Sequence, residues 1–288
     1  RTPRCYPRPA YGSMAFLPLR PVPLPEDFEA DVAAWLDSID RALDDPATDR
    51  NELCREILTD LLMPEIRDRD PETLPPATRL ALANLDPRNV TLEPEYYAEV
   101  DLEAYARVKP LLWLWEGFDR SPLGENVAVG VRFRRILARR IFRRVGANFK
   151  AFHQVKFSFG YNMEVGDDVV VHREVLLDDR GGIEIGDGAS ISDYVNVYSH
   201  SHDIVDGRHV SLPKTTIGAG ARITYHATIL AGTTVAPDSM VGAGSMLTRS
   251  TEPHAVYVGV PARQVKVKDA EARAAKPPGG PDPLADTR

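Results

Sequence analysis

The sequence predicts a mainly β protein in which a parallel β-helix of hexapeptide coils follows an α-helical region. Three observations carry this prediction. Aliphatic residues recur every six positions in the second half, glycine or another small residue follows many of them, and the first half shows helical spacing instead. We therefore expect an extended or disordered segment at 1–25, a helical region at 26–146, the β-helix at 147–268 and a disordered tail at 269–288.

The composition supports a folded protein and excludes several functional classes. Of the 288 residues, 43% are hydrophobic, which is enough for a sizeable core. The formal net charge of −7 argues against general binding to nucleic acid or anionic lipid. No stretch resembles a membrane helix or a secretory signal, so we expect a cytoplasmic protein. Cys5 and Cys54 have no disulfide or metal-ligand spacing, in keeping with a reducing compartment.

The first half shows the period of amphipathic helices, with apolar side chains at spacings of three and four. Helices are expected in the segments 28–43, 53–62, 80–85 and 96–115. Trp113, Trp115 and Phe118 near the end of the last segment could form a ligand platform. Packing in the core or between subunits is the favoured interpretation, because large aromatic side chains are mostly buried.

Residues 132–144 hold seven arginines interleaved with apolar side chains, which predicts a basic amphipathic helix. Such a helix could clamp phosphate groups or lie against an anionic surface. The favoured alternative is pairing with the acidic first half, because residues 1–125 carry 25 acidic and only 14 basic side chains.

The hexapeptide repeat is most regular towards the end of the chain. Its aliphatic positions there are Ile217, Ile223, Ile229, Val235, Val241 and Leu247. Three hexads close one triangular coil of about 18 residues, with the aliphatic residue inside and the small residue at the corner.

Two interruptions break this register. Residues 179–182 add two residues at a corner, and between Val197 and Ile217 the chain leaves the prism for a long excursion. His200, His202 and His209 lie in that excursion. Long loops on rigid scaffolds often carry function, so the excursion is the first candidate site.

Several motifs in this half occur together. They are Ile185-Gly186-Asp187, the run from Asn196 to Asp203, Thr216-Ile217-Gly218, the run from Val241 to Ser245, Thr248-Arg249 and the run from Gly259 to Arg263. Together they resemble the left-handed β-helix acyltransferases, in the branch of galactoside, maltose and nodulation O-acetyltransferases. The resemblance implies a left-handed coil and a homotrimer with active sites between neighbouring prisms. It also implies acyl transfer from an acyl-CoA, first of all acetyl-CoA, to a hydroxyl of a sugar or other small metabolite in a ternary complex.

The resemblance places the general base at His202, because imidazole can accept the proton of a hydroxyl near neutral pH. His200 is the rival base, or else a loop residue that orients its neighbour. The backbone N–H that would stabilise the oxyanion falls on His226, beside the bound acyl-CoA.

On the donor side, the resemblance assigns five further positions. Ala243 would contact the pantetheine arm, Thr248 and Arg249 would lie near the nucleotide, and Arg263 and Lys266 would supply further positive charge. An arginine at position 249 can grip a phosphate with two parallel hydrogen bonds.

On the acceptor side, we expect contacts from His172 and Asn196. His172 stands where the galactoside enzymes have a sugar-binding asparagine, although it could equally be an outward coil residue. Ile223 replaces the tryptophan of a corner in those enzymes and Tyr225 replaces a glycine. The identity of the acceptor therefore does not follow from the resemblance.

Three alternatives to the O-acyltransferase remain. N-acyl transfer to an amino sugar is a variant of the same chemistry. A non-catalytic hexapeptide scaffold would need neither His202 nor the cations of the donor side. A γ-type carbonic anhydrase would need a His-x4-His pair, which the sequence lacks, and we expect no metal.

Overall fold

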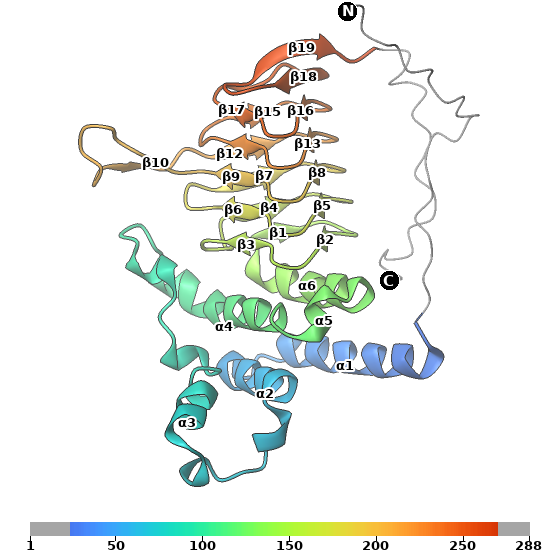
Figure 1. Ribbon diagram of the computed structural model, residues 1–288, viewed down its shortest axis with the longest axis vertical. Helices are drawn as coiled ribbons and strands as arrows, with labels where there is room; N and C mark the ends of the chain where they lie inside the picture. Colours follow the sequence, from blue (N-terminus) through green and yellow to red (C-terminus); the bar gives the residue numbers. More distant parts are fainter. Residues whose placement is uncertain (1–23, 270–288) are drawn as a thin grey trace, which may run out of the picture.

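The computed structural model describes residues 24–269, which form a layer of helices at one end of a β-prism (Figure 1). Most of the expected extended segment and tail lie outside these residues. The α-helices are α1 (Glu26–Asp44), α2 (Arg50–Leu62), α3 (Pro76–Ala83), α4 (Leu102–Phe118), α5 (Pro122–Glu125) and α6 (Val127–Ile141). Short 3-10 turns lie at η1 (Pro64–Ile66), η2 (Pro71–Thr73), η3 (Pro87–Asn89) and η4 (Glu93–Tyr96).

The helices begin where a side chain caps the first turn or where a proline stands at the helix start. Asp101 accepts a hydrogen bond from the backbone N–H of Ala104, so α4 starts at Leu102 rather than at the expected residue 96. The preceding residues form η4 instead, with Pro94 in its first turn. Asn126 caps α6 in the same way by accepting from Val129.

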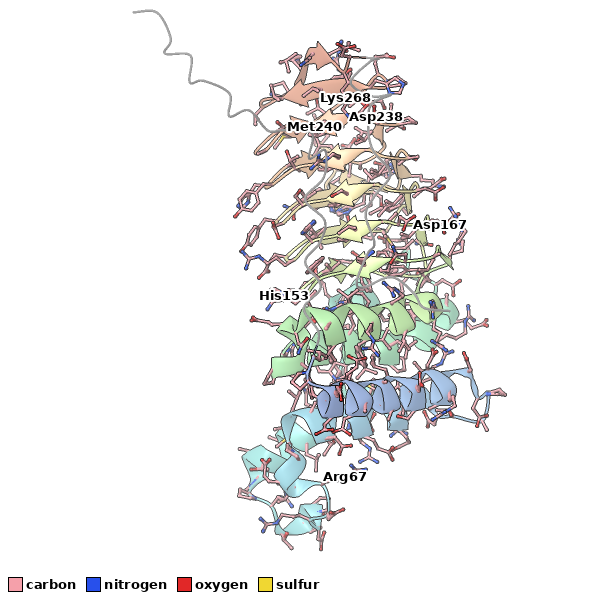
Figure 2. All side chains as sticks on the ribbon, turned by 90° about the vertical axis from the view of Figure 1, so that its right-hand side faces the viewer. Arg67, His153, Asp167, Asp238, Met240 and Lys268 are labelled. Carbon is pink, nitrogen blue, oxygen red and sulfur yellow. The ribbon has the colours of Figure 1, made fainter. Side chains whose placement is uncertain are left out.

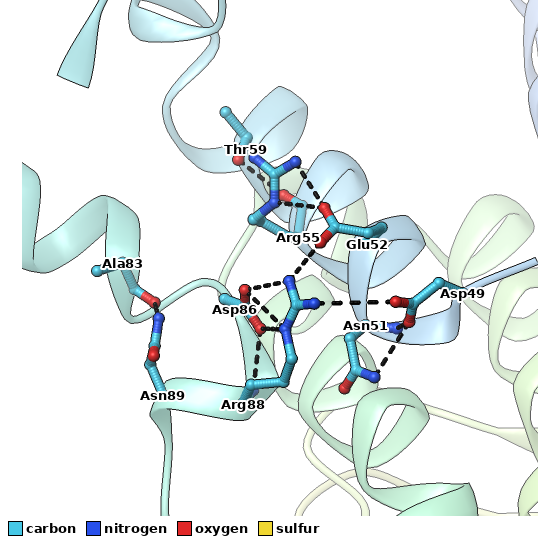
Figure 3. Close-up of polar contacts among 9 residues, drawn as sticks. All are labelled: Asp49, Asn51, Glu52, Arg55, Thr59, Ala83, Asp86, Arg88 and Asn89. Carbon is cyan, nitrogen blue, oxygen red and sulfur yellow. Dashed lines mark hydrogen bonds and ion pairs between the residues drawn. The ribbon is translucent and has the colours of Figure 1, made fainter.

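A polar network joins α2 to η3 in the helical layer (Figure 3). Arg88 pairs with Asp86 of its own turn and reaches across to Glu52, with Asp49 3.8 Å away. Glu52 also accepts two hydrogen bonds from Arg55. The contacts of Arg88 with Glu52 and Asp49 span more than thirty positions of sequence and fix η3 against α2.

The prediction for the aromatic and basic segments is confirmed in its favoured form. Trp113, Trp115 and Phe118 are buried in the core. The arginines of α6 pair with the first half of the chain: Arg132 bonds Glu29 at 2.7 Å, and Arg140 bonds Asp40 at 2.8 Å. Arginines of the basic helix therefore pair with carboxylates of the same chain, as the favoured interpretation predicts.

The prism is a parallel β-solenoid, as the hexapeptide repeat predicts. Sheet A consists of β1 (Arg144–Val145), β4 (Met163–Val165), β7 (Ile183–Ile185), β12 (Thr215–Ile217) and β15 (Thr234–Val235). Sheet B consists of β2 (Lys150–Ala151), β5 (Val170–Val171), β8 (Ser190–Ile191), β13 (Arg222–Ile223), β16 (Met240–Val241), β18 (Ala255–Val258) and β19 (Arg263–Val267). Sheet C consists of β3 (Lys156–Phe157), β6 (Leu176–Asp178), β9 (Asn196–Tyr198), β14 (Thr228–Ile229) and β17 (Met246–Leu247).

The aliphatic ladder of the sequence forms the core of the prism. In sheet A, Ile185 is paired with Ile217, and Ile217 with Val235 of the next coil. All three are fully buried. The chain thus stacks like residues from coil to coil, and the period of six arises because each coil has three faces with one such inward residue on each.

Both ends of the prism are closed. At the first coil, α6 packs on β2, and Phe142 of the helix end meets Phe149 edge-on with ring centres 5.9 Å apart. At the other end β19 turns back antiparallel to β18, and Lys268 bonds Asp238 at 2.7 Å. Figure 2 shows Lys268 and Asp238 together near that end, far from Arg67 in the helical layer. No helix among residues 24–269 is long and apolar enough to cross a membrane.

Candidate functional site

The histidine-bearing excursion is an antiparallel hairpin that projects from the side of the prism (Figure 1). Its strands are β10 (Ser201–His202) and β11 (Val210–Ser211), with His202 opposite Val210. Ser199 holds the base of the hairpin, because its buried hydroxyl donates to the Asp178 carbonyl at 2.5 Å. The hairpin therefore departs from the prism at a corner, at the end of β9, that this hydrogen bond holds in place.

His202 is exposed on this hairpin, and its ring orientation is set by one hydrogen bond. Nδ1 lies 2.7 Å from the carbonyl oxygen of Gly207. Since a carbonyl can only accept, Nδ1 carries a proton, and in the neutral ring the lone pair is then on Nε2. This is the tautomer that a general base needs.

His200 lies deeper and is held by a carboxylate that the sequence analysis missed. Its Nδ1 bonds Oδ2 of Asp178, whose side chain is buried. Oδ1 of Asp178 accepts from the hydroxyl of Ser158 at 2.8 Å. The rings of His200 and His202 are perpendicular, with centres 5.4 Å apart, so the two histidines form one cluster.

The coil register contained a signal for Asp178. Leu177 pairs with Val197 and Asp178 with Tyr198, so Asp178 lies one coil away from the start of the hairpin. A carboxylate stacked next to a histidine loop is a natural partner for imidazole. The hexad period marks only inward positions, and Asp178 is not one of them.

A second group of expected residues lies at the corner between sheets B and C. His226 sits there with φ of 57° and stacks on Tyr194, with ring centres 4.8 Å apart. Its backbone N–H donates to the carbonyl of Asp193 at 3.1 Å. The coil thus already uses the N–H that the resemblance assigned to the oxyanion.

The acceptor-side residues lie near the same corner. His172 stacks flat on Phe152 with ring centres 5.1 Å apart, and burial lowers its pKa, which favours the neutral ring. Asn196 begins β9 and donates to the carbonyl of Tyr194 at 3.5 Å. His172 lies between β5 and β6, before a sheet C strand, and Asn196 is the first residue of β9. The hairpin instead departs from the other end of β9.

The donor-side residues gather near the last coils. Ala243 and Thr248 flank β17, and both are exposed. The loop before β19 lies beside this strand, because Met246 donates to Gly259 and accepts from Ala262. Arg249, Arg263 and Lys266 are exposed, and none of them forms an ion pair with a carboxylate in the described part of the chain. Three unneutralised cations at one end suit a ligand rich in phosphate.

Within one chain, the structure therefore brings His200 and His202 together but not with His226. The histidine hairpin and the His226 corner stand at opposite ends of the sheet C strands. The donor-side cations form a third group, towards the C-terminal end of the prism.

Comparison with known proteins points to one enzyme class. Over 141 residues the chain is 30% identical to the galactoside O-acetyltransferase of Escherichia coli (strain K12), a match that covers 47% of this chain and 69% of that protein. A serine acetyltransferase of Buchnera aphidicola is 30% identical over 126 residues, which cover 40% of this chain and 45% of that one. No protein-family profile matches the chain.

Solved structures show the same similarity. A maltose O-acetyltransferase from Clostridium difficile 630 superposes with a TM-score of 0.52 and 25% identity, covering 60% of this chain and 92% of that one. A galactoside acetyltransferase in complex with coenzyme A gives a TM-score of 0.52 and 26% identity, covering 60% and 88%.

Proposed function

This chain belongs to the hexapeptide-repeat acetyltransferase family that includes the galactoside O-acetyltransferase, and on that premise we propose that it acylates a hydroxyl of a sugar or other small metabolite. It is an acyltransferase, and the proposed donor is an acyl-CoA, first of all acetyl-CoA. The observation that carries the proposal is the histidine hairpin, in which His202 has a free Nε2 next to a carboxylate-bound His200.

The proposed reaction is a direct transfer in a ternary complex. Nε2 of His202 takes the proton of the acceptor hydroxyl while the oxygen attacks the thioester carbonyl. The new C–O bond forms, the tetrahedral intermediate collapses, and the C–S bond breaks. The thiolate then takes the proton from the His202 imidazolium, so the histidine returns to its starting state.

His202 fits the role of base because its free nitrogen is exposed to an incoming acceptor. His200 fits the role of orienting neighbour, because its Nδ1 is tied to Asp178 and its ring faces that of His202. The rival assignment, with His200 as base, is supported by the same carboxylate contact. Single substitutions of His200 and His202 distinguish the two assignments.

A homotrimer is part of the proposal. In one chain His202 and the His226 corner lie at opposite ends of sheet C. A neighbouring prism could bring the corner of one chain, with His172, Asn196 and His226, to the hairpin of another. The backbone N–H of His226 already donates to the carbonyl of Asp193. It would therefore stabilise the oxyanion only as a donor shared with that carbonyl, and otherwise a different N–H would do so.

The donor site is proposed along the last coils, where Ala243 leaves room for the pantetheine arm. Thr248, Arg249, Arg263 and Lys266 supply the hydroxyl and the cations that phosphates need. Binding of acyl-CoA at these residues would also distinguish an enzyme from a non-catalytic scaffold, because a scaffold has no need to bind acyl-CoA.

The experiment is a calorimetric titration of the protein with acetyl-CoA. We expect micromolar binding that weakens roughly five-fold to ten-fold in Arg249→Ala, because one charge-assisted contact is lost. Arg67→Ala is the matched control, since Arg67 is also exposed but lies at the opposite end of the molecule (Figure 2). Absence of heat up to about millimolar ligand would favour the scaffold instead.

A further inference from the structure

A pocket lies where the helical layer meets sheet C, on the side of the histidine hairpin. Its volume is about 180 Å³, and residues 92–94, Tyr97, α4 and strands β3 and β6 supply its walls. A second hollow of about 120 Å³ shares Trp115 and Lys156 with it, so the depression continues along the junction.

The most informative wall residue is Tyr105. It is only 2% exposed, and it packs edge-on against Phe159. Its hydroxyl is buried without a hydrogen-bond partner among residues 24–269. Burial also raises the pKa of Tyr105, so the hydroxyl stays protonated and can donate. Buried polar groups nearly always have partners, so this hydroxyl requires one that residues 24–269 do not supply, from a ligand or a water molecule in the pocket.

The remaining walls combine aromatic and polar groups. Tyr97 and Phe157, which are half-buried, offer ring surfaces, and the hydroxyl of Tyr97 donates to Glu93. At the rim, Lys156 adds a hydrogen-bond donor with a side chain that is 58% exposed, and the hydroxyl oxygen of Ser158 adds an acceptor. Pockets of this kind, mostly apolar with a few placed polar groups, suit a hydroxylated ring whose C–H faces lie on the aromatic surfaces.

The pocket is connected to the histidine cluster through side chains already described. Ser158 lines the pocket and donates to Asp178, which in turn holds His200. Strands β3, β6 and β9 are successive neighbours in sheet C, so the pocket and the hairpin base are roughly 10 Å apart along the prism.

The helical layer is anchored at the same place. Arg180, at the corner after β6, bonds Glu99 and lies over the ring of Tyr97 at 4.0 Å. Figure 1 shows the segment before α4 projecting to the same side of the prism as the hairpin with β10. The wall that carries Tyr97 is thus fixed relative to the corner from which the histidine hairpin leaves.

We infer that this pocket is a binding subsite for the distal unit of an extended acceptor. The ligand is an oligosaccharide of two or more rings, whose acylated hydroxyl lies at His202 and whose distal ring donates to or accepts from Tyr105. The inference rests on the proposed acyl transfer, and it gives the helical layer a function: selecting acceptors by length.

The test is direct binding of sugars to the full-length protein saturated with coenzyme A. The probes are glucose, maltose and maltotriose, together with galactose and lactose. Their binding is measured by ligand-observed NMR titration. We expect affinity to rise with length, and the longer sugars to bind about five-fold more weakly to Tyr105→Phe, as the loss of one hydrogen bond predicts. Tyr105→Phe should fold normally, because it removes a hydroxyl that has no partner.

Tyr96→Phe is the matched control, since Tyr96 is 80% exposed and does not line the pocket. Equal affinity for all lengths, equal affinity of Tyr105→Phe and wild type, or no binding of any sugar by a protein that binds coenzyme A would each overturn the subsite. Failure to bind coenzyme A would instead overturn the proposed acyl transfer, whatever the sugars do.

Discussion

At the scale of single residues, Asp179 shows how a corner of the solenoid constrains ionisation. Its side chain is fully buried and accepts backbone hydrogen bonds from Phe159 at 2.7 Å and Asn162 at 3.2 Å. Burial outweighs these bonds and raises the pKa of Asp179 to about 6. The folded protein therefore holds the proton more tightly than the unfolded chain does.

This shift predicts the sign of a pH effect. The contribution of Asp179 to the free energy of unfolding is largest below pH 4 and falls by about 3 kcal/mol as the pH rises through 6 to about 7. Asp179→Asn lacks that titration. We therefore expect the stability difference, wild type minus variant, to decrease from pH 4 to pH 6 in urea unfolding. A difference that increases over this range would contradict the account.

The histidine cluster marks the limit of what single residues could reveal before the structure. Motif resemblance singled out His200 and His202, and the fold places them together. Asp178 and Ser158 were missed, because a hexad period reports only the side chains that point into the prism. The orphan hydroxyl of Tyr105 was likewise invisible, since it depends on packing between α4 and the first coils.

At the scale of structural elements, the close stacking of coils explains the glycines that follow the aliphatic positions. A Cβ on Gly218 would lie 2.6 Å from the backbone nitrogen of Pro237 in the next coil. A Cβ on Gly186 would meet Ala219 at the same distance. The neighbouring atoms are backbone, so the coils themselves would have to separate.

Gly218→Ala should therefore destabilise the protein by about 1–3 kcal/mol, as overpacking does in other cores. Gly207→Ala is the control, because a Cβ at that position in the hairpin meets nothing within 4 Å. Thermal or urea unfolding of both variants checks the prediction. Equal stability of the two variants would mean that coil spacing does not require glycine at position 218.

The sequence predicted the elements unevenly, for a physical reason. Each coil repeats the same inward contacts, so the six-residue period of the sequence predicts β-strands that pair at separations of 18 or 20 residues. The helices have no such repeat. The start of α4 was misplaced because the cap at Asp101 and the turn at Pro94 outweigh the apolar pattern around them.

At the scale of the whole molecule, the helical layer and the prism share one core. Asp119 at the end of α4 bonds Arg134 of α6 and accepts from the backbone N–H of Gln154 at 2.7 Å. Arg134 also donates to Ala151 at 3.3 Å and is only 1% exposed. A buried ion pair thus joins two helices to the first coil.

Asp119→Ala would leave the Arg134 guanidinium buried without its counter-charge. We expect a loss of about 3–5 kcal/mol in the free energy of unfolding, and a single unfolding transition for helices and prism. Circular dichroism during urea unfolding would check both. Arg67→Ala, which breaks an exposed pair with Asp60, should change stability by less than about 1 kcal/mol.

The central claim is acyl transfer from acetyl-CoA with His202 as the base. Its most direct test is the rate of thiol release from acetyl-CoA with maltotriose or lactose as acceptor, in wild type, His202→Ala, His200→Ala and His209→Ala. We expect His202→Ala to lower kcat by about 10² to 10⁴ with unchanged acetyl-CoA affinity, and the exposed hairpin control His209→Ala to behave as wild type. Full turnover in His202→Ala, or its loss in His200→Ala alone, would contradict the claim.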